Sequence, residues 1–375
     1  MPELPAMPTP AELESSPSRK PSSFSRDLFK LVSGTTLAQI IALLASPVIA
    51  RLYDPDAFGI FALMSSIVSI ITAVYSLRYE LAIVLPKRAS DGANLLAGTL
   101  GITILTTILT IPVIWLGGPI IASWLNAPGL LPYLWMIPVL LLFGGVGAGH
   151  PVLNVWAGRV RYFKEVSIVQ VIRSISVVIG SLTAGFLGIH SAAGLLSGTL
   201  LGSLIPPVML GWHIWSHDKN LFLESVRWND ILANLKRYWK FAVYNTPSAL
   251  LNTLSWQVPS FLLMMFFSPA VVGYYAFSSQ LLRGPMNLIG DSIAQVFHAH
   301  ASTARHEGKL AEFTETIFRR LVEYSFFPIL MLIVVGREVV LVIFGASWAE
   351  AGVYIQILSL WMIFWFISSP MSRLY

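Results

Sequence analysis

The chain consists of long apolar segments separated by short polar linkers. Each segment has roughly the 20 residues that a helix needs to cross the ~30 Å hydrocarbon core of a bilayer. Ten such segments are present, at residues 31–50, 59–79, 93–116, 131–151, 166–188, 193–215, 241–267, 271–296, 321–344 and 353–369. Alternation with a period of two is absent, which argues against a membrane β-barrel. The pattern predicts an all-α polytopic membrane protein with about ten transmembrane helices.

Composition agrees with this prediction and excludes several classes of protein. Hydrophobic residues make up 55% of the 375 residues and charged residues only 11%, whereas an ordinary soluble domain has roughly 25% charged residues. The net charge is +5, but the basic residues are distributed between apolar segments, so no nucleic acid partner is expected. The chain has no cysteine, and no metal, nucleotide or nucleophile motif is present. We therefore expect no cofactor and no enzymatic activity.

The basic residues orient the helices. Of the 24 Lys and Arg residues, 20 lie before the first segment, in the linkers that follow even-numbered segments, or after the last segment. Only Arg51 and Arg337 lie on the other side. By the positive-inside rule the N-terminus is cytoplasmic. We predict a disordered cytosolic tail (1–27), an N-terminal bundle of six helices (28–217), a cytosolic linker (218–240) and a C-terminal bundle of four (241–375).

An internal repeat relates the two predicted bundles. Prolines, glycines and alanines recur in order about 212–214 residues apart, as the pairs Pro47 and Pro259, Pro55 and Pro269, Gly59 and Gly273, and Ala62 and Ala276. Both copies start on the cytoplasmic side, so the repeats are parallel. Parallel repeats are a known transporter plan, with the substrate site between the halves. Because the second copy holds four segments and the first six, we expect a C-terminally truncated form of a twelve-helix transporter.

One predicted helix carries a stripe of costly polar groups. Gln280, Arg283, Asn287 and Asp291 are spaced so that they share one face of the eighth segment. An Arg or Asp at the centre of a bilayer costs about 2.5–3.5 kcal/mol on insertion scales. The stripe is therefore expected to line a polar cavity, or alternatively to hold an Arg283–Asp291 ion pair that fixes helix packing.

Other polar residues at membrane depth are further candidates. Asn245 and Asn252 form a similar stripe on the seventh segment, although small polar groups also mediate helix packing. Arg173 could contact a ligand or extend to the cytosolic surface, and Arg78 lies near the inner end of the second segment. Asp291 and Glu80 are the carboxylates among the polar residues of these segments.

Residues 31–87 resemble the opening of a known family. The features that carry the resemblance are Arg51-Leu52-Tyr53, Asp54-Pro55, Phe58-Gly59 and the run Arg78-Tyr79-Glu80. They resemble the polysaccharide and oligosaccharide flippases, of the lipid-linked O-antigen type, in the multidrug/oligosaccharidyl-lipid/polysaccharide exporter superfamily. The ending WFISSPMSRLY resembles the tenth helix of that family.

The resemblance implies a function. A flippase of this kind moves an oligosaccharide on polyprenyl diphosphate from the cytoplasmic to the outer leaflet of the inner membrane. It serves surface polysaccharide synthesis, such as that of lipopolysaccharide O-antigen or exopolysaccharide. The implied mechanism is alternating access around a cationic cavity. The implied partners are the lipid-linked oligosaccharide, membrane lipids, H+ or Na+, and other glycan-assembly membrane proteins. For coupling to H+ or Na+, Asp291 and Glu80 are the candidate titrating carboxylates.

Two alternatives remain open from the sequence. A cation-coupled multidrug antiporter of the same superfamily would need acidic residues in its cavity, whereas Arg173 and Arg283 favour an anionic ligand. An integral-membrane glycan ligase or polymerase usually needs a large polar outer loop, whereas the outer linkers here, such as 117–130 and 188–192, are short and nearly uncharged.

Overall fold

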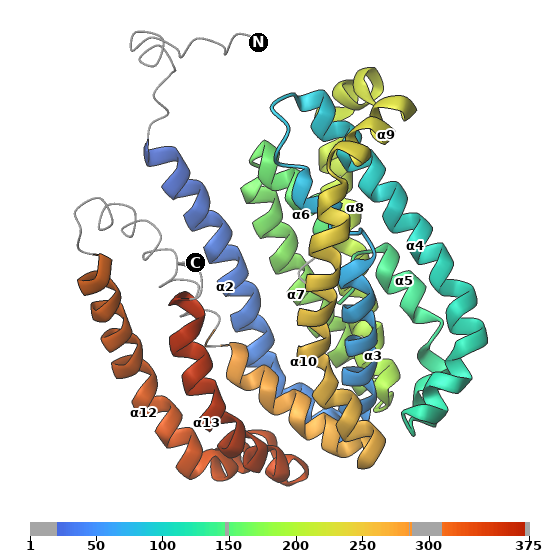
Figure 1. The fold of residues 1–375 in the computed structure, drawn as a ribbon. Helices are drawn as coiled ribbons and strands as arrows, with labels where there is room; N and C mark the ends of the chain where they lie inside the picture. The colour runs from blue at the N-terminus through green and yellow to red at the C-terminus, as the bar shows by residue number, and fades with distance from the viewer. Residues whose placement is uncertain (1–20, 147–149, 285, 287–309, 372–375) are drawn as a thin grey trace.

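The computed structural model describes residues 21–146, 150–284, 286 and 310–371 (Figure 1). Within these residues the chain is helical and has no strand. Eight helices are long and apolar enough to cross a membrane, at Gly34–Leu52, Pro55–Val74, Ala89–Trp124, Phe163–Phe186, Ala192–Ser225, Phe241–Phe266, Phe318–Phe344 and Ala346–Ser368. They match eight of the ten predicted segments, so the prediction of an all-α polytopic membrane protein is confirmed.

The other two predicted segments differ from single continuous helices. The fourth, 131–151, is divided into a 3-10 helix η2 (Pro128–Tyr133) and the short helices α5 (Met136–Leu142) and α6 (Pro151–Val160). Gly144 and Gly145 between them have φ of +100° and +76°, which a helix cannot accommodate but glycine adopts readily. The eighth predicted segment is helical over residues 269–284 (segment 269–284), and most of its remainder lies outside the described residues.

Three helices of the first half pack with little space between their backbones. They are α2 (Pro21–Leu52), α7 (Phe163–Phe186) and α8 (Ala192–Ser225). A Cβ atom on Gly34 of α2 would lie 2.6 Å from the side chain of Ser167 on α7, and one on Gly180 of α7 would lie 2.7 Å from Gly198 of α8. The glycines thus allow close approach, as small residues do in membrane helix interfaces. Because α2 begins at Pro21, it includes the last residues of the predicted tail.

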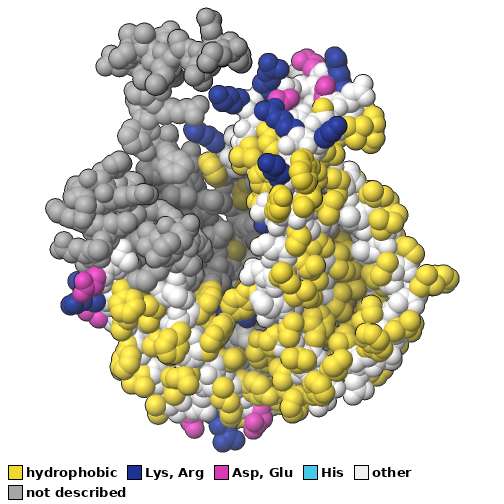
Figure 2. All heavy atoms as spheres, in the orientation of Figure 1, with side chains coloured by type: hydrophobic (Ala, Val, Ile, Leu, Met, Phe, Trp, Pro, Cys, Tyr) yellow, Lys and Arg dark blue, Asp and Glu magenta, His cyan; other side chains and the backbone are white. Residues whose placement is uncertain are grey.

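The predicted cytosolic linker is helical and attached to the first half. Helix α9 (Trp228–Arg237) packs on α4 (Ala89–Trp124), where a Cβ atom on Gly98 would lie 2.9 Å from Ile231. At the start of α9, buried Asn94 donates to the Ser225 carbonyl (2.9 Å) and accepts from the Arg227 amide (3.1 Å). Lys and Arg side chains gather at the end of the molecule where α9 lies (Figure 2). This is the end that the sequence assigns to the cytoplasm.

At the opposite end the two halves meet through residues that the internal repeat had paired. A Cβ atom on Gly59 of α3 (Pro55–Val74) would overlap the carbonyl of Pro269, and one on Gly273 would overlap the carbonyl of Pro55. Such a reciprocal contact is what two copies related by an approximate twofold axis produce. The N-termini of α3 and segment 269–284 therefore lie in direct backbone contact.

Aromatic side chains surround this contact. Phe58 of α3 lies edge to face with Phe277 of segment 269–284, with ring centroids 5.6 Å apart. Both rings contact Trp348, at 4.9 and 4.3 Å. The indole Nε1 of Trp348 donates to the carbonyl of Ala50 at the end of α2 (2.7 Å). This end of the bundle is thus closed by a buried aromatic cluster.

Gly59→Ala is expected to lower the melting temperature of the purified protein in detergent. The added methyl group overlaps the Pro269 carbonyl, and overpacking of this kind typically costs ~1–3 kcal/mol. Gly101→Ala is the matched control, because a Cβ atom at this helical position meets no atom within 4 Å. A Gly59→Ala variant that melts like the wild type would show that the two helices are not in contact there.

Candidate functional site

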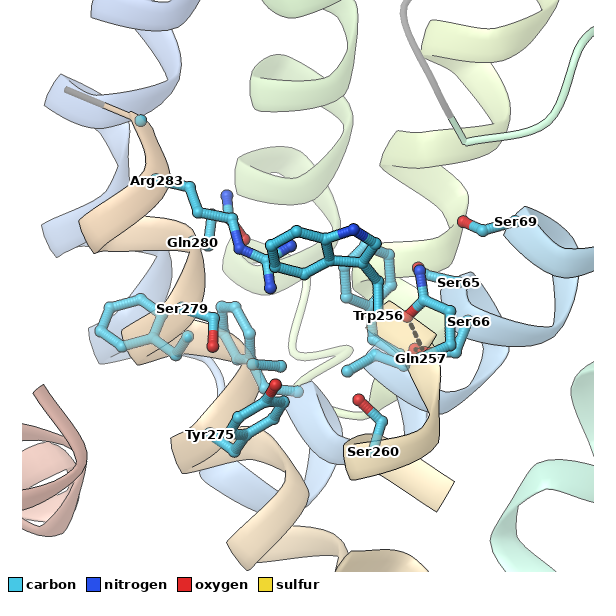
Figure 3. Close-up of a pocket in the computed structure, with 16 residues that line it drawn as sticks. Ser65, Ser66, Ser69, Trp256, Gln257, Ser260, Tyr275, Ser279, Gln280 and Arg283 are labelled. Carbon is cyan, nitrogen blue, oxygen red and sulfur yellow. Dashed lines mark hydrogen bonds between the residues drawn. The ribbon is translucent and has the colours of Figure 1, made fainter. Parts of the chain in front are cut away.

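A cavity of about 360 Å³ lies between the two halves (Figure 3). Its walls come from α3, from α10 (Thr246–Phe266) and from segment 269–284. Sixteen described residues line it: Phe58, Phe61, Ala62, Ser65, Ser66, Ser69, Trp256, Gln257, Ser260, Tyr275, Ala276, Phe277, Ser279, Gln280, Arg283 and Gly284. Ala62 and Ala276, which the internal repeat pairs, both line the cavity. The cavity therefore lies beside the approximate twofold axis that relates the two halves.

The lining is rich in neutral hydroxyl and amide groups. Five serines, two glutamines and one tyrosine are distributed over all three walls. The Ser66 hydroxyl donates to the Gln257 Oε1 atom (2.9 Å) and so connects α3 to α10. Among the sixteen lining residues one is cationic, Arg283, and none is acidic. This lining suits a polyhydroxylated ligand that carries negative charge.

Arg283 has an unusual environment. Its guanidinium carbon lies 4.5 Å from the centre of the Trp256 ring, as Figure 3 shows. Within the described part of the chain, the guanidinium forms no ion pair with a carboxylate and its Nε has no hydrogen-bond partner. A cation over an indole face is stabilised by the ring quadrupole, but the N–H donors stay available to a ligand. Trp256 also lies edge to face with Trp361 and Trp365, with ring centroids 5.6 and 6.2 Å apart.

The structure places the predicted residues of the second half as follows. Gln280 and Arg283 line the cavity together, from one face of segment 269–284. Asn287 and Asp291 lie outside the described residues, so their share in the site stays a prediction. Asn252 is one helical turn before Trp256 on α10 and Asn245 lies in the π-helical turn η3 (Phe241–Asn245); neither is among the lining residues.

The predicted residues of the first half have protein partners. Arg173 on α7 donates to the carbonyl of Val146 (2.6 Å), next to the break after α5. Arg78 forms an ion pair with Glu80 (3.2 Å), and the Ser76 hydroxyl donates to the same carboxylate (2.7 Å). Glu80 is only 4% exposed. None of these residues lines the cavity.

Several lining residues were not singled out from the sequence. Gln257 and Ser260 follow Asn252 on α10, and Ser279 precedes Gln280. Gln257 could have been found, because an amide in an apolar membrane helix requires a partner at that depth. Its partner Ser66 could not, because serine in a membrane helix can bond to its own backbone, as Ser66 also does through the carbonyl of Ala62.

Comparisons with known proteins agree with this geometry. A family model described as polysaccharide biosynthesis protein matches residues 48–353. The chain belongs to this polysaccharide biosynthesis protein family. A comparison with curated protein sequences finds no match. The family membership bears out the resemblance noted in residues 31–87.

A solved structure shares the fold of this polysaccharide biosynthesis protein. It is titled "Inward-facing conformation of a multidrug resistance MATE family transporter of the MOP superfamily". The two chains are 14% identical, with a TM-score of 0.53 over 91% of this chain and 80% of the other. At this identity the likeness shows a common fold and carries no information about the substrate.

Arg173→Met is expected to lower the melting temperature of the purified protein, without any ligand present. The substitution leaves the Val146 carbonyl without its donor, and an unsatisfied buried polar group costs ~1–3 kcal/mol. Arg173→Lys keeps a donor and should retain most of the stability. If Arg173→Met melts like the wild type, the hydrogen bond from Arg173 to the Val146 carbonyl is dispensable for stability. A role of Arg173 in ligand contact would then gain support.

Proposed function

We propose that this protein moves a glycan carried on a polyprenyl diphosphate from the cytoplasmic to the outer leaflet of the inner membrane, for surface polysaccharide synthesis. The observation that carries the proposal is the cavity between the halves, where Arg283 faces a lining of hydroxyl and amide groups at membrane depth. The polysaccharide biosynthesis family supports the glycan part of the proposal, and the transporter fold supports movement across the membrane.

The diphosphate is the part of such a substrate that cannot cross hydrocarbon unaided, because an unpaired ion in a medium of low dielectric constant is prohibitively costly. Arginine offers several N–H donors in a planar fork that matches phosphate oxygens. In this proposal the Arg283 guanidinium binds the diphosphate, with Asn287 further along the same predicted helix face.

The glycan part needs neutral partners. Sugar hydroxyls exchange hydrogen bonds with amides and hydroxyls, and here Gln257, Gln280 and the cavity serines supply them. The Trp256 ring offers an apolar face for a pyranose ring. The absence of Asp and Glu among the sixteen lining residues favours this substrate over the cationic drug of an antiporter.

Alternating access is the proposed mechanism. The end formed by Gly59, Gly273 and the aromatic cluster is closed in this structure, and a solved structure with the same fold is titled as inward-facing. Transport would require this end to open after the cytoplasmic side has closed. Coupling to H+ or Na+ through Asp291 or Glu80 is part of the proposal.

Arg283→Ala is expected to abolish surface glycan in cells that depend on this protein for its display. Arg283→Lys keeps the charge but loses the planar fork. It should reduce display by about tenfold or more, since a hydrogen bond to a charged group contributes ~1.5–3 kcal/mol.

Display is measured by lectin or antibody binding at equal protein amounts in the membrane. The control is Arg319→Ala, an exposed arginine paired with Glu315. Normal display by Arg283→Ala would refute the role of the cavity.

Thiol cross-linking tests the proposed opening. The chain has no cysteine, so Ala62→Cys/Ala276→Cys introduces the only two thiols, one on each half of the cavity. A short bifunctional thiol reagent should stop glycan display by the double variant, and the single variants should be unaffected. Full display with complete cross-linking would show that α3 and segment 269–284 need not separate.

A further inference from the structure

The hydrogen bond between Ser66 and Gln257 joins the two halves inside the cavity. The Ser66 hydroxyl on α3 donates to the Oε1 atom of Gln257 on α10 (2.9 Å), and Figure 3 shows this bond between two walls of the cavity. Because α3 belongs to the first half and α10 to the second, any movement that separates the two helices breaks the bond. Ser66 is only 3% exposed, so its hydroxyl is sheltered from water.

The bond lies at the point where the environment of α10 changes. On the outer side of the bond, Met264 of α10 belongs to the same buried apolar cluster as Leu63 and Met64 of α3. On its cytoplasmic side, Asn252 and Ser255 of α10 are exposed. The bond is thus the polar inner edge of the contact that holds α10 against α3 toward the closed outer end.

Ser66 has a second acceptor for its proton. The carbonyl oxygen of Ala62, one turn earlier on α3, lies at the same distance of 2.9 Å from the Ser66 hydroxyl. A serine hydroxyl has one proton to donate, and in a helix it can donate to the carbonyl four residues earlier. Ser66 therefore keeps a hydrogen bond when Gln257 moves away.

Gln257 depends on a donor from outside its own helix. Within the described part of the chain, its Oε1 atom accepts from Ser66, and an acceptor that loses its donor without replacement costs free energy. A bound ligand displaces water from the cavity, so the ligand itself must supply the new donor. A sugar hydroxyl can do so. The ionised oxygens of a diphosphate only accept hydrogen bonds, and an isoprenoid chain has no polar hydrogen.

We propose that Gln257 is a specificity-determining residue, which makes the opening of the outer end depend on a ligand that carries hydroxyl groups. A lipid diphosphate is then moved when it carries a sugar and retained when it does not. This inference rests on the proposed function and assigns the selection to one residue of the cavity. Arg283 binds the diphosphate that both lipids share and therefore cannot distinguish them, whereas Gln257 contacts the part in which they differ.

Distances across the outer end test the role of the bond without any ligand. The chain has no cysteine, so Ser191→Cys/Ser347→Cys introduces two exposed thiols for spin labels, one on each half. Double electron–electron resonance on the full chain in nanodiscs should show mainly one short distance. Gln257→Leu and Ser66→Ala should each raise the ratio of a longer to the short distance about two- to tenfold, which corresponds to the ~0.5–1.5 kcal/mol of one hydrogen bond. The matched control Gln280→Leu removes the other cavity glutamine and should keep the short distance.

Two lipids test the selection on the same labelled protein: geranylgeranyl diphosphate, and the same lipid with one glucose on its diphosphate. The wild type should shift toward the longer distance with the glycosylated lipid only, whereas Gln257→Leu should respond to both lipids alike. An equal response of the wild type to the two lipids, or a Gln257→Leu variant as closed as the wild type, would overturn this proposal and leave the proposed function standing. A wild type that responds to neither lipid would overturn both.

Discussion

The placement of arginines within this helix bundle depends on the free-energy cost of removing a guanidinium group from water. Arg159 and Arg173 meet this cost with backbone carbonyls: Arg159 donates to those of Ile83 and Pro86 (2.6 and 2.7 Å), and Arg173 to that of Val146. Arg283 instead has the face of Trp256 and a cavity. Of these three guanidinium groups it is the one whose donors face an open polar space. This contrast gives the proposed anion site its physical basis.

The same carbonyls show how the fold tolerates interruptions in its helices. In hydrocarbon an unpaired backbone group costs several kcal/mol, so irregular backbone must be buried against protein donors. At the break after α5, Arg173 and Ser203 supply these donors to Val146 and Gly145. Arg159 does the same where the chain leaves the 3-10 turn η1 (Tyr79–Ala82). Arg159, Arg173 and Ser203 of the first half therefore satisfy backbone carbonyls, whereas Gln280 and Arg283 of the second half face the cavity.

Periodicity was sufficient to predict eight of the ten segments as membrane-spanning helices and the shared face of Gln280 and Arg283, because these depend on local sequence. The break in the fourth segment was missed, although the run of glycines from 144 to 149 carried its signal. The partners of Arg173 and Gln257 could not be predicted, because they depend on the depth and angle at which helices distant in sequence meet. For the same reason the pairing of Arg78 with Glu80 was visible only in the structure.

Helix α9 is attached to the first half. Gly98 lets α9 approach α4 closely and Asn94 bonds to the backbone at its start, so the connecting segment packs as part of the first half. The next element is the π-helical turn η3 (Phe241–Asn245), a helix form that is rare and is frequently found at functional sites. If the second half rocks about the first, as the proposed alternating access requires, these five residues are irregular backbone at the junction of the two halves and are where the chain would bend.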